Sequence, residues 1–170
     1  FRSDAREKVL RGASQLADAI RITLGPKSKS VLIQKNWGAP IVCNDGVTIA
    51  KEMELKDPEE NLGARMLREA AEKTGEAVGD GTSTATILAH AIYVEGLRNI
   101  AAGASGIDLK RGLDRALKVA VASIRGLSRP VESRREKEQS ATCSAQNDSV
   151  LGQLVADAME QVGREGVVSV

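Results

Sequence analysis

The chain has 170 residues, 24 Lys and Arg against 23 Asp and Glu, and 42% hydrophobic residues with one Trp, one Tyr and one Phe. This length supports one or two small domains with an aliphatic core. The balanced charge gives no reason to expect nucleic acid or an anionic membrane as a partner, and no apolar run approaches the length that spans a bilayer. Cys43 and Cys143 lack metal-ligand spacing, which favours reduced thiols in a cytoplasmic protein.

The first predicted element is an amphipathic helix over residues 4–22, whose apolar residues recur at helical spacing. Gly25 and Pro26 end it. The segment from Thr23 to Lys27 therefore follows a helix C-terminus, which is a poor phosphate site because of its dipole. From these residues alone, a simple Gly-Pro helix stop is the better interpretation.

Two short strands are predicted next, because apolar runs between Val31 and Cys43 flank the turn residues Asn36-Trp37-Gly38. The run Asn44-Asp45-Gly46 is first of all a turn signal. Asp57-Pro58-Glu59-Glu60 then predicts the start of a long helix, with an acidic N-cap and Pro at the first position. The apolar face predicted for this helix consists of Leu62, Met66, Leu67, Ala70, Ala71 and Val78.

The most informative segment is residues 75–92, where Gly79-Asp80-Gly81 leads through Thr82-Ser83-Thr84 into an apolar helix. Glycines allow close backbone approach to a ligand, and the N–H groups of a helix N-terminus favour anions. Asp80 would repel a phosphate unless it holds Mg²⁺ between itself and phosphate oxygens. The segment indicates a metal–nucleotide phosphate site. A glycine turn followed by an ordinary Thr/Ser N-cap is the alternative that these residues leave open.

The remaining sequence predicts further helices. Ser105 and Asp108 form a capping box that opens one of them. Residues 125–130 break the helical pattern and mark a domain boundary, which divides the chain into residues 1–127 and 128–170. A solvated, highly charged helix at residues 132–140, an amphipathic helix at 150–159 and a short strand at 167–170 follow. The single histidine, His90, lies in an apolar stretch, which favours a packed core residue over a catalytic one.

Three motifs together resemble the ATP site of chaperonins. TLGPK at residues 23–27, NDGVTIAKE at 44–52 and GDGTSTAT at 79–86 occur in that family's order and spacing. The run EGLRNIAAGASGIDLKRGLDRA at residues 95–116 is similar to the group I, GroEL-type branch, and the resemblance continues to GREGVVSV at 163–170. The chain thus resembles a group I chaperonin over essentially its whole length.

The resemblance implies a set of site residues. Thr23, Leu24, Gly25 and Pro26 would line the nucleotide, and Asp80 would hold Mg²⁺. Asp45 would have a catalytic role near the γ-phosphate, where it helps to position the hydrolytic water. The phosphate-binding residues would be Gly81, Thr82, Ser83 and Thr84.

The fold implied by the resemblance is mainly α. Residues 1–127 would be the N-terminal part of an ATP-binding equatorial domain, a helical bundle with a small β-hairpin, and residues 128–170 the start of an α/β intermediate domain. We expect the chain to be an N-terminal fragment, without the apical domain, the returning intermediate segment or the C-terminal equatorial half. That missing intermediate segment carries a further catalytic aspartate in the family, so the isolated chain is expected to be inactive and poorly stable or self-associating.

The implied function is an ATPase with ATP and Mg²⁺ as cofactors, which encloses non-native polypeptides in a homo-oligomeric double ring with a co-chaperonin lid as partner. Asn44 departs from the lysine usual in group I and removes a positive charge beside the phosphates. This departure leaves a non-hydrolysing structural paralogue as an alternative. An unrelated helical nucleotide-binding module is disfavoured by the long match outside the ligand loops.

Overall fold

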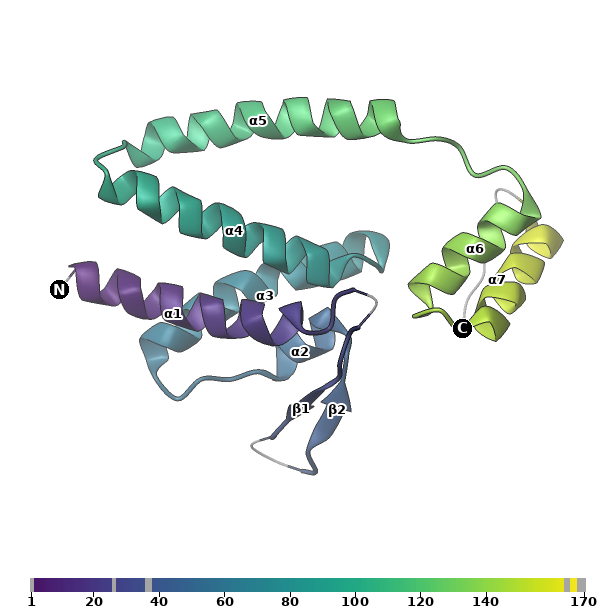
Figure 1. The fold of residues 1–170 in the computed structure, drawn as a ribbon, viewed down its shortest axis with the longest axis horizontal. Coiled ribbons are helices and arrows are strands. Elements are labelled where there is room, and N and C mark those ends of the chain that lie inside the picture. Colours follow the sequence, from purple (N-terminus) through teal and green to yellow (C-terminus); the bar gives the residue numbers. More distant parts are fainter. Residues whose placement is uncertain (1, 26, 36–37, 164–165, 168–170) are drawn as a thin grey trace. The chain divides into compact units, whose positions relative to one another are not determined.

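The computed structural model describes residues 2–25, 27–35, 38–163 and 166–167. The chain is mostly helical and contains one β-hairpin (Figure 1), which confirms the predicted fold class. The predicted strand at 167–170 lies largely outside the described residues. In order, the elements are α1 (Arg2–Arg21), β1 (Val31–Ile33), β2 (Ile41–Cys43), α2 (Gly46–Glu52), α3 (Pro58–Val78), α4 (Thr82–Ala101), α5 (Gly106–Leu127), α6 (Arg134–Ser144) and α7 (Ser149–Val162).

The chain forms two compact units, one up to Lys110 and one from Arg111 onward. This division falls inside α5, which has no buried residue. The domain boundary expected at residues 127 and 128 stays a prediction. Among the helices in the described part of the chain, none is both long enough and apolar enough to cross a membrane.

The core of the first unit forms where α1 packs against α3 and α4. The apolar stripe predicted for α1 is buried, with Leu16 and Ile20 at 1% and 0% exposure. Two glycines allow the backbones to approach closely: a Cβ on Gly12 would lie 1.8 Å from the carbonyl oxygen of Glu60, and one on Gly63 would lie 1.9 Å from that of Val9. The other buried members of this core are Ala13, Ala17, Ile33, Ile49, Ala50, Ala64, Leu67 and Ala71.

The helix α3 begins as predicted, with Asp57 as the N-cap that accepts hydrogen bonds from the N–H groups of Glu59 and Glu60. The apolar face predicted for this helix is only partly correct. Leu67 and Ala71 are buried, whereas Leu62, Met66 and Val78 are 54%, 51% and 72% exposed. Apart from Leu67, the buried stripe runs through the small residues Gly63, Ala64 and Ala71, because α1 approaches α3 too closely at Gly63 for a larger side chain.

The hairpin pairs β1 and β2 antiparallel, with Val31 opposite Cys43 and Ile33 opposite Ile41. Side chains alternate between the two faces of a strand, so Ile33 is buried while Leu32 and Val42 are 70% and 72% exposed. The β2 strand ends at Cys43, three residues before α2 begins.

In the second unit, α6 packs against α7. Ser133 and Glu136 form a capping box at the start of α6, and Asp148 caps α7, which ends at Gly163. Ion pairs join Arg134 to Asp157 and Lys137 to Glu160 across the two helices. Helices lie at both predicted places, and the charged one is solvated as expected. The apolar face predicted for the second is wrong in detail, since the buried residues of α7 are Gly152 and Ala156, whereas Val150 and Leu154 are 73% and 64% exposed.

Candidate functional site

The turn between α3 and α4 is built from two glycines in the left-handed region. Gly79 ends α3 with φ of +72°, and its N–H donates to the carbonyl of Gly75 at 2.9 Å. Gly81 is the N-cap of α4 with φ of +76°. Residues with a side chain rarely adopt this conformation, so the sharp reversal between the two helices favours glycine at positions 79 and 81.

The N-terminus of α4 begins with Gly81 as its N-cap, and Thr82 is the first helical residue. The ordinary Thr/Ser N-cap left open by the sequence is therefore wrong. A glycine has no side-chain acceptor for the first-turn N–H groups, which ligands or other groups must satisfy. The oriented amides also give this end of α4 a partial positive charge that favours anions. The backbone of Thr82-Ser83-Thr84 is therefore suited to a phosphate.

Asp80 precedes this helix and is exposed. Its Oδ1 accepts a hydrogen bond from the N–H of Gly81 at 2.6 Å. In the described part of the chain, no group of three or more His, Cys, Asp or Glu side chains could hold a metal. Mg²⁺ is usually bound through one or two carboxylates plus substrate phosphates and waters, so one exposed carboxylate beside a phosphate-binding turn suits that ion. The role of Asp80 as metal ligand stays a prediction.

Asp45, the predicted catalytic residue, is the N-cap of α2. Its Oδ2 accepts hydrogen bonds from the backbone N–H of Thr48 at 2.8 Å and from Thr48 Oγ1 at 2.6 Å. Both bonds end on Oδ2, so Oδ1 is the oxygen that could orient a water. The turn interpretation of Asn44-Asp45-Gly46 missed the helix that follows. The signal was present, since Asp is among the preferred N-cap residues.

Cys43 supports the backbone at this point. Its Sγ accepts a hydrogen bond from the N–H of Asp45 at 3.3 Å and lies 3.6 Å from the Asp45 carbonyl oxygen. Composition alone treats Cys43 as an isolated thiol and gives no sign of this contact. The neighbouring Asn44 is exposed, and its role toward phosphates stays a prediction.

The N-termini of α2 and α4 meet, and we call this contact the α2–α4 junction. It consists of Gly46 and Val47 from α2, Gly75 from α3, and Thr82 and Ser83 from α4. A Cβ on Gly46 would lie 2.4 Å from Ser83 Oγ, and a Cβ on Gly75 would lie 3.6 Å from Thr82 Cγ2 and 3.8 Å from Val47 Cγ2. The junction brings the helix capped by Asp45 against the helix that follows Asp80, although the two residues are far apart in sequence.

The segment after α1 is a turn. Thr23 Oγ1 donates to the Ile20 carbonyl at 2.7 Å, the Leu24 N–H donates to the Arg21 carbonyl at 3.2 Å, and Gly25 has φ of +87°. These bonds return to α1 and match the predicted helix stop. Figure 1 shows the C-terminal end of α1 on the same side of the helical unit as the N-terminal end of α4. Pro26 lies outside the described residues, and the nucleotide role of this segment stays a prediction.

His90 lies on α4 at 9% exposure, and its Nε2 is 3.0 Å from Ser14 Oγ on α1. Burial is the main cause that lowers the pKa of His90; nearby Arg21 also lowers it, while Asp18 raises it. The expected packed core histidine is confirmed.

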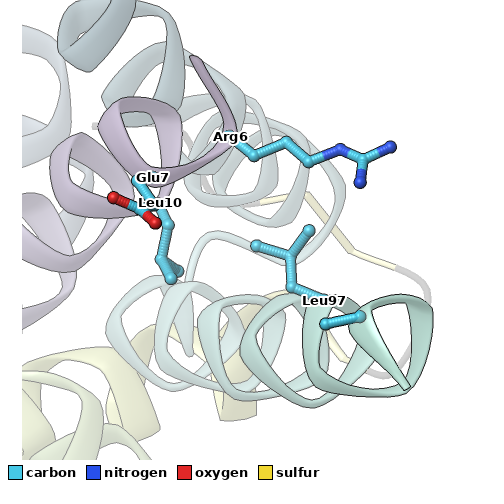
Figure 2. A pocket seen from close by; sticks show the side chains of 5 residues that line it. Arg6, Glu7, Leu10 and Leu97 are labelled. Carbon is cyan, nitrogen blue, oxygen red and sulfur yellow. The ribbon is translucent and has the colours of Figure 1, made fainter. Parts of the chain in front are cut away.

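A separate hollow of about 220 Å³ lies between α1 and α4, lined by Arg6, Glu7, Leu10, Leu97 and Ala101 (Figure 2). It is mostly apolar, and none of its lining residues belongs to the predicted nucleotide site. Its walls offer no group suited to phosphate or metal chemistry beyond the exposed side chains of Arg6 and Glu7.

Comparisons with known proteins show which family the chain resembles. The profile of the TCP-1/cpn60 chaperonin family matches residues 16–168. Chaperonin GroEL 5 of Bradyrhizobium diazoefficiens (strain JCM 10833 / BCRC 13528 / IAM 13628 / NBRC 14792 / USDA 110) is 71% identical over 170 residues, which is 100% of this chain and 31% of that protein. The crystal structure of a group III chaperonin in the open state aligns with a TM-score of 0.76 and 29% identity, over 93% of this chain and 32% of that one.

This chain thus spans about a third of the length of these relatives. The identity to a GroEL protein confirms the resemblance to group I chaperonins. The family match extends over α2, α3, α4 and the α2–α4 junction, and we conclude that the chain belongs to the TCP-1/cpn60 chaperonin family.

Proposed function

We propose that this chain supplies part of a Mg-ATP site in a chaperonin subunit and that the complete subunit hydrolyses ATP. The observation that carries the proposal is the α2–α4 junction. It places the helix capped by Asp45 against the glycine-capped N-terminus of α4. The carboxylate that would orient water and the amides that would bind phosphate both lie at the N-termini of these packed helices.

Each part has a role in phosphoryl transfer. The first-turn amides of α4 would bind phosphate oxygens and stabilise negative charge without reorganisation. Asp80 would hold Mg²⁺, which neutralises charge on the phosphates when bound. Asp45 would orient the attacking water through Oδ1 while Oδ2 remains bonded to Thr48. Closure of further parts of the subunit would exclude bulk water.

The wider function follows from family membership. We propose a cytoplasmic chaperone that encloses non-native polypeptides in a double ring of identical subunits with a co-chaperonin lid. A refolding assay with a full-length subunit that carries this sequence tests the proposed chaperone activity. ATP-dependent recovery of a denatured substrate enzyme is the expected result, and recovery that is independent of ATP would contradict it.

The nucleotide site is tested by Asp80→Asn in the same full-length subunit. A neutral amide has nearly the same shape but is a poor Mg²⁺ ligand, so steady-state ATP turnover at saturating Mg²⁺ should fall by at least tenfold. Asp148→Asn is the matched control, because Asp148 is an exposed carboxylate at a helix start in the second unit. Unchanged turnover in Asp80→Asn would exclude Asp80 as the ligand.

Asn44 favours a second candidate, a structural paralogue that binds nucleotide without turnover. The same assay separates the two candidates. Calorimetric binding of ATP without measurable hydrolysis in the unsubstituted protein would support the structural paralogue, and hydrolysis that depends on Asp80 would exclude it.

A further inference from the structure

Gly46 and Ser83 touch at the point where α2 and α4 begin. A Cβ on Gly46 would lie 2.4 Å from Ser83 Oγ and 3.0 Å from both the Cα and the backbone N of Ser83. Gly46 is buried, so the neighbouring atoms cannot simply move into solvent. Inserting even one methyl group into a closely packed contact displaces side chains and backbone. The absence of a side chain at position 46 therefore sets how closely the two helices approach.

We propose that Gly46 and Ser83 are positioning residues, whose contact sets the separation between Asp45 and the phosphate-binding turn of α4. This inference rests on the proposed function. Asp45 is covalently joined to Gly46, so a displacement of Gly46 moves the carboxylate directly. On the other side, the contact includes the backbone N of Ser83, one of the amides offered to phosphate. This one contact therefore involves both the residue that follows Asp45 and an amide proposed to bind phosphate.

The contact also changes the role of the Ser83 side chain. Its Oγ is the atom nearest to the Cβ position of Gly46, so the hydroxyl faces α2 and acts as a spacer. Ser83 contributes to phosphate binding through its N–H. The other side of the junction does not share this tightness, because a Cβ on Gly75 would make ordinary contacts of 3.6 and 3.8 Å.

The test begins with Gly46→Ala in a full-length subunit that carries this sequence. A misplacement of about 1 Å can lower a rate on the order of 100-fold. We expect kcat for ATP to fall about 10- to 100-fold, with a smaller change in KM. Gly75→Ala is the matched control, since it adds the same methyl group at the same junction without a close contact, and its kcat should stay within about twofold of the unsubstituted value.

The decisive variant is Gly46→Ala with Ser83→Ala. Loss of Oγ removes the 2.4 Å contact and leaves neighbours at 3.0 Å, so kcat should recover above the value expected from the two single variants. A merely structural role of Gly46 would lower the melting temperature and leave kcat of the folded protein unchanged. If Gly46→Ala does not fold, a folded and active double variant supports the proposal, and an unfolded one overturns it.

The outcomes distinguish a failure of the proposed ATPase function from a failure of the positioning role of Gly46 and Ser83. An unsubstituted protein without turnover would overturn the proposed function and this inference with it. An active protein in which Gly46→Ala retains full kcat, or in which Ser83→Ala gives no recovery, would overturn the positioning role alone.

Discussion

Asp45 holds a structural and a proposed chemical role, and two substitutions separate them. The carboxylate caps α2 through bonds of 2.8 Å to the Thr48 N–H and 2.6 Å to Thr48 Oγ1. Asn is as good an N-cap as Asp, whereas Ala removes the cap at a cost of about 0.5–2 kcal/mol. Asp45→Asn should therefore preserve α2, and Asp45→Ala should loosen it. A helix of seven residues has little stability of its own to offset that loss.

Hydrogen exchange of the α2 amides in the full-length subunit measures the structural part. A loss of about 0.5–2 kcal/mol corresponds to roughly 2- to 30-fold faster exchange in Asp45→Ala, and Asp45→Asn should exchange at the original rate. Steady-state ATPase assays measure the chemical part. Both variants lose the negative charge that orients water, so both should lose about 100-fold or more in kcat. An Asp45→Asn protein with full turnover would refute the reasoning and leave Asp45 as a helix cap alone.

Three further predictions follow from other features. Burial lowers the pKa of His90 in the folded state, so the unfolded chain binds the proton more readily; the free energy of unfolding should fall as pH drops through about 6.5, level off below the folded pKa, and show no such change in His90→Gln. Asn44→Lys should tighten ADP binding in calorimetry by less than the roughly 1.5–3 kcal/mol of a buried charged contact, because position 44 is exposed and solvent screens the charge; equal or weaker affinity would mean that position 44 faces elsewhere. The 170-residue chain should self-associate in size-exclusion chromatography without ATP turnover, because α5 exposes apolar residues such as Leu117 and Ile124 at 63% and 65%, and an active monomer would contradict this.

Much of the fold could be predicted because its signals are local. The acidic cap at Asp57 starts α3, and the apolar stripe of α1 is buried as its helical spacing predicts. Errors arose where neighbours decide the outcome. Periodicity placed Leu62 and Met66 on the buried face of α3, yet they are about half exposed, because α1 packs closely onto a stripe of small residues. Such a close approach depends on pairs of residues from different helices and cannot be read from one helix alone.

The site was predicted less completely than the fold. The motif containing Asp80 could be recognised from its residues, and the resemblance added Asp45. The contact between Gly46 and Ser83 joins residues 37 positions apart by their numbering, and no periodic pattern or turn rule links them. The bond from the Asp45 N–H to Cys43 Sγ was likewise hidden, since a lone cysteine carries no positional signal.

The short helix α2 packs in the hydrophobic core and carries Asp45 as its N-cap. Ile49 and Ala50 of α2 pack into the core, with exposures of 1% and 0%. Arg68 of α3 donates a hydrogen bond of 2.9 Å to the carbonyl of Met53, the C-cap of α2. Because seven residues cannot hold a helix by themselves, these contacts fix its axis, and the axis in turn fixes the carboxylate at its N-cap. Changes in core packing around Ile49 should therefore alter the geometry of Asp45 before they unfold the chain. A site built in this way is sensitive to its hydrophobic support as well as to its charged residues.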